Sequence, residues 1–600
     1  MEQGSLVQER LERLRGLMAD RGMDAYLVPT ADFHGSEYVG EPFKCRSFLT
    51  GFTGSAGTLA VTAKDAALWV DGRYFVQAAE QLKGSGVRMM KMGVEGVPEL
   101  EDYIIGQIPE GGCLGFDGRV ADSATGKKLE EQLAAKKASI RYEEDLVDLV
   151  WEDRPALPSK PVWILEECYA GKSAAAKLSD LRAAMDKEGA TVHVLTTLDD
   201  IAWLLNLRGD DVACNPVFLS YLAVTKKEAF LFIDPKKLDE KVRGHLAALS
   251  VTSCPYDSIY TYVKALRKER LLLEESMVNY RLIRSVHPSV QVICRVNPTV
   301  LAKAVKNPVE IENMKKAHLK DGLVMTRFLL WLKKNSGKRP MSELSLQHKL
   351  DGMRREQEGC LGLSFDTISA YGAHGAMCHY SATVDSDIPV EAKGFYLVDS
   401  GGQYYEGTTD ITRTVAMGPL TQEQKEHYTL VLMSMLRLAD VRFPYGARGL
   451  TLDYAARQVF WERGLNFDHG TGHGVGYLLN VHERPVGIRW KLVPERMDSC
   501  ILEPGMITSD EPGIYIEGSH GIRTENLLLC VEDEKTAYGR FLRFEHLTCV
   551  PIDLDGIDRS LMTDRDVRLL NDYHRQVYEK LSPFFTGEEK EWLEEATRAI

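Results

Sequence analysis

The chain has 600 residues, of which 44% are hydrophobic and 27% charged, and its formal net charge is −14. This composition is ordinary for a soluble globular protein of several domains, and the acidic balance argues against a nucleic-acid-binding surface. The 11 cysteines include no CxxC pair, which favours reduced thiols. The N-terminus lacks an apolar signal core, and no apolar run approaches the roughly 20 residues of a membrane span. The sequence therefore predicts a soluble, cytoplasmic protein.

The first predicted domain covers residues 1–153. Apolar residues recur at helical spacing over 11–18 and predict an amphipathic helix. Short apolar runs at 25–29 and 67–70 predict strands. An α/β domain is expected here.

A proline-rich stretch over 153–161 marks the start of the second predicted domain, residues 154–306. It repeats the order of the first, with a helix expected over 174–188 and a strand over 191–195. A duplicated α/β domain is the simplest explanation of this weak repeat. Chance similarity between two ordinary α/β units is the alternative.

The third predicted domain covers residues 307–600. Asn307, Pro308 and Glu310 form the pattern of a helix start, with a capping residue, proline at the first helical position and an acid in the first turn. The residues with the most distinctive chemistry lie in the middle of this domain.

Two strand-like segments of the third domain each contain an aspartate, Asp399 and Asp410, with glycines between them. A hairpin that turns at Tyr404–Tyr405 would place the two carboxylates directly opposite each other. Opposed carboxylates repel and destabilise a sheet, so such a pair indicates a cation between them.

A second pair follows the same pattern. A hairpin centred on Gly518 would place Glu511 opposite Glu525, and Arg523 would share a strand face with Glu525. The alternative for any one of these acids is a cap, turn or edge residue, but two opposed pairs in one region favour a shared site.

The segment from His469 to Gly476 contains too many glycines for a helix, so it is not a helical two-histidine zinc motif. In an extended chain His469 and His473 share a face, and His482 follows nearby. Four carboxylates and one imidazole suit two hard or borderline divalent ions. Carboxylates favour Mn²⁺ or Mg²⁺, and the imidazole admits Mn²⁺, Zn²⁺ or Co²⁺.

Several motifs resemble those of the Xaa-Pro aminopeptidases, the aminopeptidase P group with the pita-bread fold, in its long three-domain cytosolic form. The motifs in the third domain are Val398-Asp-Ser-Gly-Gly, Thr409-Asp-Ile-Thr-Arg-Thr, Gly470-Thr-Gly-His-Gly-Val-Gly, Ser509-Asp-Glu-Pro-Gly-Ile-Tyr and Gly521-Ile-Arg-Thr-Glu-Asn. Trp69-Val-Asp-Gly-Arg-Tyr and Asp200-Ile-Ala-Trp-Leu-Leu-Asn-Leu-Arg-Gly extend the resemblance to the first two domains.

The resemblance implies two creatinase-like α/β domains followed by a pita-bread metallopeptidase domain. It implies a homodimer with two divalent ions, Mn²⁺ above all, and peptide substrates with proline at the second position. The implied metal ligands are Asp399, Asp410, His473, Glu511 and Glu525, with Asp410 and Glu525 bridging the ions.

The resemblance also implies roles for residues around the metal ions. His379, His469 and His482 would be active-site histidines, with His379 and His482 touching the substrate. Arg73 would reach toward the substrate, and Arg523 would support the metal cluster. His374 is outside the family pattern and is expected in an exposed loop.

Three other functions share this kind of site or fold. A prolidase has the same metal site but prefers dipeptides, and a creatinase has the fold without metals. A non-catalytic binding module, such as a histone chaperone with this fold, loses the ligand set. The five intact ligand positions argue against the last two, and the length of the chain favours the aminopeptidase over the prolidase.

Overall fold

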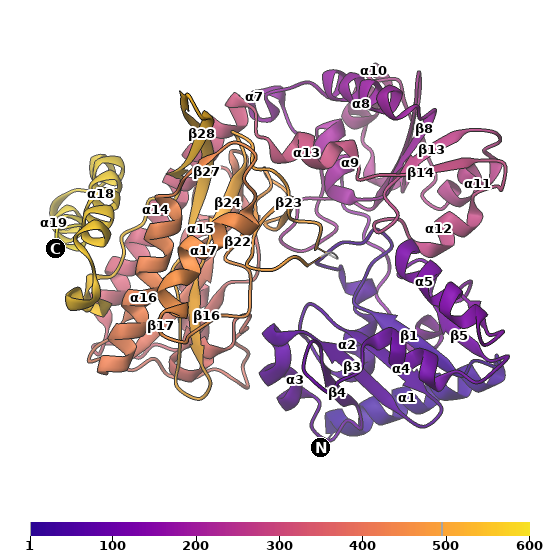
Figure 1. Cartoon of the computed structure of the whole chain (residues 1–600), viewed down its shortest axis with the longest axis horizontal. Helices are drawn as coiled ribbons and strands as arrows, with labels where there is room; N and C mark the ends of the chain where they lie inside the picture. Colours follow the sequence, from indigo (N-terminus) through magenta and orange to yellow (C-terminus); the bar gives the residue numbers. More distant parts are fainter. Residues whose placement is uncertain (1, 494–495) are drawn as a thin grey trace. The chain divides into compact units, whose positions relative to one another are not determined.

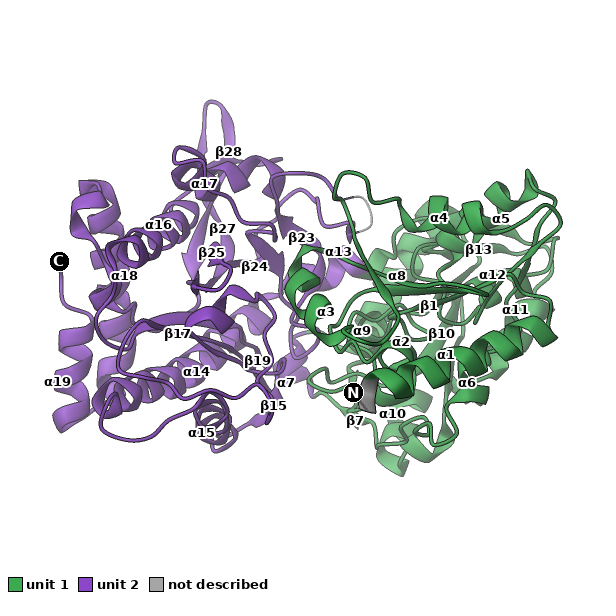
Figure 2. Ribbon diagram, turned by 90° about the horizontal axis from the view of Figure 1, so that it is seen from below, with its two compact units in different colours: residues 1–165, 172–299 green, residues 166–171, 300–600 purple. Residues whose placement is uncertain are grey.

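The computed structural model describes residues 2–493 and 496–600. The chain divides into two compact units, which Figure 2 colours separately: unit 1 is Met1–Leu165 with Lys172–Thr299, and unit 2 is Glu166–Gly171 with Val300–Ile600. The expected division into three domains stays a prediction. In the described parts of both units, no helix is both long enough and apolar enough to cross a membrane.

Unit 1 contains two six-stranded sheets within its described residues. The strands of the first are β1 (Ala25–Pro29), β2 (Thr58–Thr62), β3 (Ala66–Val70), β4 (Arg88–Lys91), β5 (Cys113–Phe116) and β6 (Ser139–Arg141). Those of the second are β8 (Val192–Leu195), β10 (Ser220–Thr225), β11 (Ala229–Ile233), β12 (Val251–Cys254), β13 (Arg270–Leu273) and β14 (Gln291–Cys294). A two-stranded pair consists of β7 (Trp163–Ile164) and β9 (Leu207–Arg208).

The two large sheets share one topology. Their strand orders are β4-β3-β2-β1-β5-β6 and β12-β11-β10-β8-β13-β14. In each, the strand after the opening helix pairs antiparallel on one side and parallel on the other: β1 with β2 and β5, β8 with β10 and β13. This match agrees with the duplicated α/β domain expected from the sequence.

Helices alternate with these strands along the chain of unit 1. They are α1 (Glu2–Asp20), α2 (Cys45–Thr50), α3 (Phe75–Gln81), α4 (Leu100–Gln107), α5 (Ser123–Ala134), α6 (Leu146–Val150), α8 (Ala174–Glu188), α9 (Leu198–Leu205), α10 (Glu240–Ala248), α11 (Ser258–Ala265) and α12 (Tyr280–Ser285). The helix expected over 174–188 is confirmed. Ser173 caps its first turn, and Gly189, with φ +68°, ends it in the left-handed conformation that glycine favours.

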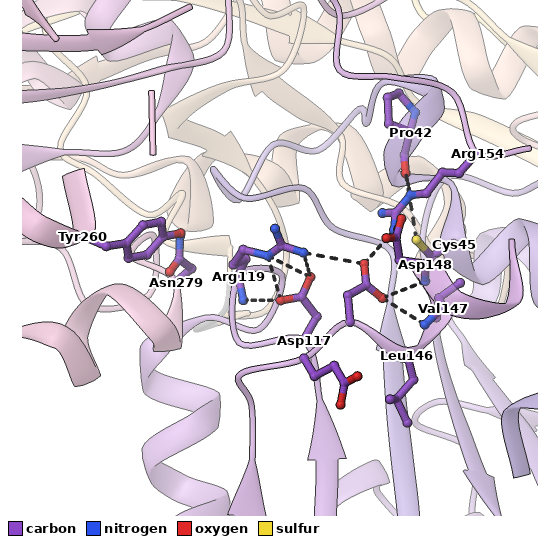
Figure 3. Close-up of polar contacts among 12 residues, drawn as sticks. Pro42, Cys45, Asp117, Arg119, Leu146, Val147, Asp148, Arg154, Tyr260 and Asn279 are labelled. Carbon is purple, nitrogen blue, oxygen red and sulfur yellow. Dashed lines mark hydrogen bonds and ion pairs between the residues drawn. The ribbon is translucent and has the colours of Figure 1, made fainter. Parts of the chain in front are cut away.

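A chain of alternating acids and arginines, of which Asp117 is buried and the others are partly exposed, joins β5 to α6 in unit 1 (Figure 3). Arg119 Nη2 lies 3.0 Å from Asp117 Oδ2 and 3.7 Å from Asp145 Oδ2. Arg154 Nη1 lies 2.6 Å from the same Asp145 oxygen and donates through Nε to the Pro42 carbonyl at 2.7 Å. Burial raises the pKa of Asp117. Burial of a carboxylate costs desolvation free energy. The neighbouring arginine charges offset part of that cost, which an isolated buried acid would not recover.

Unit 2 contains the remaining strands. They are β15 (Cys360–Leu363), β16 (Ile368–Tyr371), β17 (Phe395–Ser400), β18 (Gly402–Tyr404), β19 (Gly407–Thr408), β20 (Ile411–Ala416), β21 (Arg442–Pro444), β22 (Gly472–Gly474), β23 (Glu483–Ile488), β24 (Ile507–Asp510), β25 (Gly513–Ile516), β26 (His520–Arg523), β27 (Asn526–Thr536) and β28 (Gly539–His546). The sheet orders are β15-β18-β19, β16-β17-β20, β21-β28-β27-β24-β22-β23 and β25-β26.

Long helices pack beside the strands of unit 2. They are α14 (Pro308–Asn335), α15 (Glu343–Arg355), α16 (Gln422–Ala439), α17 (Gly449–Trp461), α18 (Asp564–Leu581) and α19 (Gly587–Ala596), with the short α7 (Glu167–Ala170) and α13 (Pro298–Ala304). The helix start expected at Asn307 is confirmed, because its side chain and that of Glu310 form a capping box. Figure 1 shows α18 and α19 at the side of unit 2 away from β22 and β24.

Candidate metal centre

The first acid pair lies on a hairpin whose turn differs from the expected one. In the antiparallel pairing of β17 with β20, Asp399 lies opposite Thr412, not opposite Asp410. The turn is at Tyr405–Glu406, because Gly407 has φ +136° and closes the hairpin after Tyr404. The expected direct opposition of the two aspartates is therefore wrong.

The same register places Gly401 opposite Asp410. A side chain at Gly401 would lie 1.9 Å from the carbonyl oxygen of Thr409, so only glycine fits there. Both aspartates are nonetheless buried, and the charge of Asp399 acts on Asp410. They meet diagonally across the hairpin.

The second acid pair has the expected register. Gly518, with φ +72°, lies at the centre of the hairpin. Gly513 pairs with Arg523 on one side, and Asp510 pairs with Asn526 on the other. Glu511 and Glu525 consequently oppose each other between these two ladders.

The two hairpins are joined through Thr412. Its hydroxyl donates to Glu525 Oε2 at 2.8 Å, and its carbonyl accepts from the backbone N–H of Glu525 at 3.1 Å. Glu525 is buried, with 1% of its surface exposed. The acid pairs therefore converge on one side of the β17–β20 hairpin.

His473 joins this cluster from β22, in an extended segment as expected. Its Nδ1 donates to the Gly474 carbonyl at 2.9 Å, which leaves Nε2 as the lone-pair nitrogen. Nε2 lies 3.5 Å from Asp410 Oδ2 and 3.4 Å from Glu511 Oε1. The backbone contact thus fixes the tautomer that a metal ligand requires.

The donor set fits divalent metal ions. Ligand atoms of Asp410, His473 and Glu525 all lie within 4.8 Å of one another. Asp399 Oδ1 and Glu525 Oε1 are buried without a hydrogen-bond partner. Burial, and then the neighbouring carboxylates, raise the pKa values of Asp410 and Glu525 well above their ordinary range. Buried, mutually repelling oxygens at this spacing are what a cation would compensate.

Arg523 connects the cluster to a phenol that the sequence interpretation missed. Its Nη2 lies 2.6 Å from Asp399 Oδ2, and its Nη1 donates to the Tyr515 hydroxyl at 2.9 Å. The Tyr515 hydroxyl lies 2.8 Å from Nε2 of His469, whose Nδ1 donates to Gly470 at 2.8 Å. Desolvation, together with the Arg523 charge, lowers the pKa of His469 to about 3. His469 is therefore neutral, and its Nε2 accepts a hydrogen bond from the Tyr515 hydroxyl.

Tyr515 carried a signal in the sequence. It lies within the same motif as Glu511, and the Gly518 hairpin that was used to pair Glu511 with Glu525 also places Tyr515 opposite Gly521. The sequence therefore predicts the position of Tyr515 as well as that of Glu511.

The structure places the other expected residues with less detail. The His482 ring centroid lies 4.3 Å from that of His473. His379 is half-buried in the segment after β16, and Arg73 lies in unit 1, where its guanidinium pairs with Asp71 at 2.7 Å. The roles of these three residues stay predictions.

His374 is not in the exposed loop that was expected. Its Nδ1 lies 3.0 Å from each carboxylate oxygen of the buried Glu343, and its ring centroid lies 4.6 Å from that of Tyr380. The expectation failed because the partner acid is 31 residues away in sequence, at the start of α15. His374 therefore anchors the segment that leads to His379.

Comparisons with known proteins match nearly all of the chain. Residues 10–148 and 153–310 match models of the creatinase/prolidase N-terminal domain, residues 312–532 match metallopeptidase family M24, and residues 540–600 match the C-terminal region of peptidase M24. These matches confirm the expected fold class.

Curated relatives and a solved structure match over similar lengths. A probable Xaa-Pro aminopeptidase P of Pyrenophora teres f. teres is 39% identical over 98% of this chain and 92% of its own. Its counterpart in Pyricularia oryzae is 40% identical over 98% of both chains. The crystal structure of X-prolyl aminopeptidase from Caenorhabditis elegans, described as a cytosolic enzyme with a di-nuclear active site, matches with TM-score 0.93 and 35% identity, over 99% of this chain and 100% of that one.

Proposed function

Because this chain belongs to the Xaa-Pro aminopeptidase P group of the M24 metallopeptidases, we propose that it removes the N-terminal residue from peptides whose second residue is proline. The observation that carries the proposal is the convergence of four carboxylates and one imidazole in unit 2. Similarity over the whole length of the chain supports the same activity.

The proposed ligands of two divalent ions are Asp399, Asp410, His473, Glu511 and Glu525, with Asp410 and Glu525 shared between the ions. Mn²⁺ is the proposed metal, because oxygen donors with a single imidazole suit it. When bound, two such ions supply a water nucleophile at neutral pH and polarise the scissile carbonyl.

The chain's own residues then bind the peptide and move its protons. Glu511 is half-buried, with 20% of its side chain exposed, so its carboxylate is the acid placed to accept a proton from the attacking water. His379 and His482 are proposed to hold the carbonyl oxygen and the proline nitrogen, which must gain a proton to leave. Arg73 is proposed to bind the substrate, and His469 to act through the hydroxyl of Tyr515.

A prolidase is the nearest alternative. The solved Xaa-Pro dipeptidase of Bacillus anthracis is 26% identical with TM-score 0.51, but it covers only 64% of this chain, against 99% of its own. The additional length favours longer substrates, and a tripeptide distinguishes the two activities. A non-catalytic binding module is disfavoured by the intact donor set.

A homodimer and a cytoplasmic location complete the proposal. The exposed ring of Trp461 lies between those of Tyr454 and Trp490, with centroid distances of 5.9 and 6.3 Å. Together the three rings offer an apolar surface that a second copy would cover. Light scattering that gives twice the chain mass of 67.3 kDa supports the dimer, and the single mass overturns it. Cell fractionation tests the location, for which the C. elegans protein provides the support.

The test of the activity is release of the N-terminal residue from an Arg-Pro-Pro peptide, after chelation and again after Mn²⁺ is added back. Cleavage that is lost and then restored supports the metal-dependent aminopeptidase. Cleavage of Xaa-Pro dipeptides alone identifies a prolidase. If the folded protein cleaves neither the tripeptide nor the dipeptides with any divalent ion, the proposed enzymatic activity is wrong.

A further inference from the structure

We propose that Asp321 of α14, together with Arg354 of α15, is a positioning residue that holds the Asp399–Asp410 hairpin in its metal-binding geometry. This inference rests on the proposed metal centre. Neither residue is among the proposed ligands or the residues that touch the substrate, and both side chains are fully buried, at 0% exposure.

The Asp321 carboxylate accepts four hydrogen bonds. Its Oδ1 accepts from Arg354 Nε at 2.7 Å and from the Tyr404 hydroxyl at 2.9 Å. Its Oδ2 accepts from the Thr409 hydroxyl at 2.7 Å and from Arg354 Nη2 at 3.2 Å. Two oxygens have about four lone-pair sites, so the acceptor capacity of the carboxylate is filled.

These bonds reach both strands of the hairpin beside the two acids. Thr409 directly precedes Asp410, and its hydroxyl also accepts from the backbone N–H of Gly402 at 2.9 Å. On the other strand Arg354 Nη2 donates to the Ser400 hydroxyl at 3.1 Å, and Ser400 directly follows Asp399. One ion pair thus fixes the residue next to each carboxylate.

The arrangement exceeds what a structural ion pair between two helices needs. The two hydrogen bonds between Arg354 and Asp321 would satisfy such a pair. Here Asp321 makes two further bonds, and both end on the hairpin, at Tyr404 and Thr409. The pair is neutral overall, so it ties down two strands whose acids repel each other and adds no net charge near them.

The test is a titration of Mn²⁺ into protein from which metal has been removed by chelation and desalting. Free Mn²⁺ is measured by its electron paramagnetic resonance signal. Thr409→Val removes the hydroxyl but keeps the side-chain shape. Groups that orient metal ligands typically contribute about 10-fold to 100-fold in affinity, and we expect a loss in that range. Thr409→Ser restores the hydroxyl and should stay within about threefold of the wild type.

Thr429→Val is the matched control. The Thr429 hydroxyl is also buried, donates to the Lys425 carbonyl at 2.7 Å and accepts from the backbone N–H of Asp558 at 2.8 Å, and neither partner belongs to the hairpin. It should bind Mn²⁺ like the wild type, even with a lowered melting temperature.

Ser400→Ala tests the other strand and covers the case in which Thr409→Val fails to fold. We expect a weaker but measurable loss, about threefold to tenfold, because a single hydrogen bond from Arg354 is removed. Affinities within twofold of the wild type for both hairpin variants overturn the inference, as does an equal loss in Thr429→Val. A wild-type protein that binds no Mn²⁺ overturns the metal centre itself.

Discussion

When its metal is removed, unit 2 should become less stable as the pH rises above the mildly acidic range. Asp410 and Glu525 have pKa values raised well above their ordinary values of 3.8 and 4.5, by burial first and then by the charges of neighbouring carboxylates. The folded, metal-free protein therefore holds a proton that the unfolded chain has released. Its free energy of unfolding should fall as pH rises from the unfolded-state pKa values toward the folded-state ones. Below the unfolded-state values this destabilisation is absent.

The size of the effect follows from one shared proton. One proton bound by the folded state but not by the unfolded one changes the free energy of unfolding by about 1.4 kcal/mol per pH unit. Unit 2 has roughly 300 residues, so its unfolding entropy is about 0.6 kcal/mol per kelvin. The melting temperature of the metal-free protein should consequently fall by about 2 °C for each pH unit within this window.

The assay is calorimetric unfolding in chelator between about pH 5 and about pH 8, with Asp410→Asn as the matched variant. The amide keeps the shape but removes one of the repelling charges. At the alkaline end the variant should therefore melt above the wild type, and the difference should shrink toward mild acid. A difference that stays constant with pH, or a wild type that melts higher throughout, refutes the assigned repulsion.

Three further predictions concern the loaded site. Mn²⁺ affinity should fall steeply in mild acid, because the ligands must lose protons to bind; isothermal titration that finds no change between about pH 5 and about pH 8 contradicts this. Asp410→Ala should abolish activity and leave the circular dichroism spectrum intact, and retained activity in Mn²⁺-replete buffer excludes Asp410 as a ligand. Tyr515→Phe should lower kcat by about tenfold or more with unchanged metal content, since His469 and Arg523 both lose a buried partner; wild-type kcat would show that the phenol is structural.

The elements of the fold were predictable from local patterns. The strand over 25–29 and the helix over 174–188 have apolar periodicity and end at residues suited to turns or caps, and both lie where the sequence placed them. The repeat of two α/β domains was also readable, because each copy must bury an equivalent sheet. The pairing order of the strands was not, since it depends on contacts between residues distant in sequence.

The same distinction separates the parts of the site. Acidic residues in apolar strands can be recognised from the sequence as candidate ligands, because an unpaired acid in such a strand is unfavourable. The groups that orient them do not: Glu343 and Asp321 occur in ordinary amphipathic helices, where an acid is expected to face solvent. Their buried positions became apparent only once α14 and α15 were placed against the strands.

The turn of the Asp399–Asp410 hairpin lies one residue later than the sequence predicted, yet the two acids still share a face. The sequence placed Asp410 opposite Asp399, where the structure has Thr412. Side chains alternate along a strand, so a shift of two residues keeps the same face, whereas a shift of one would have moved Asp410 to the other face. The expected convergence of the two acids therefore survived an error in their pairing. The true register also suits the metal-free protein better, because a diagonal pair with Gly401 opposite Asp410 separates the two charges along the strand and avoids the direct opposition that destabilises a sheet.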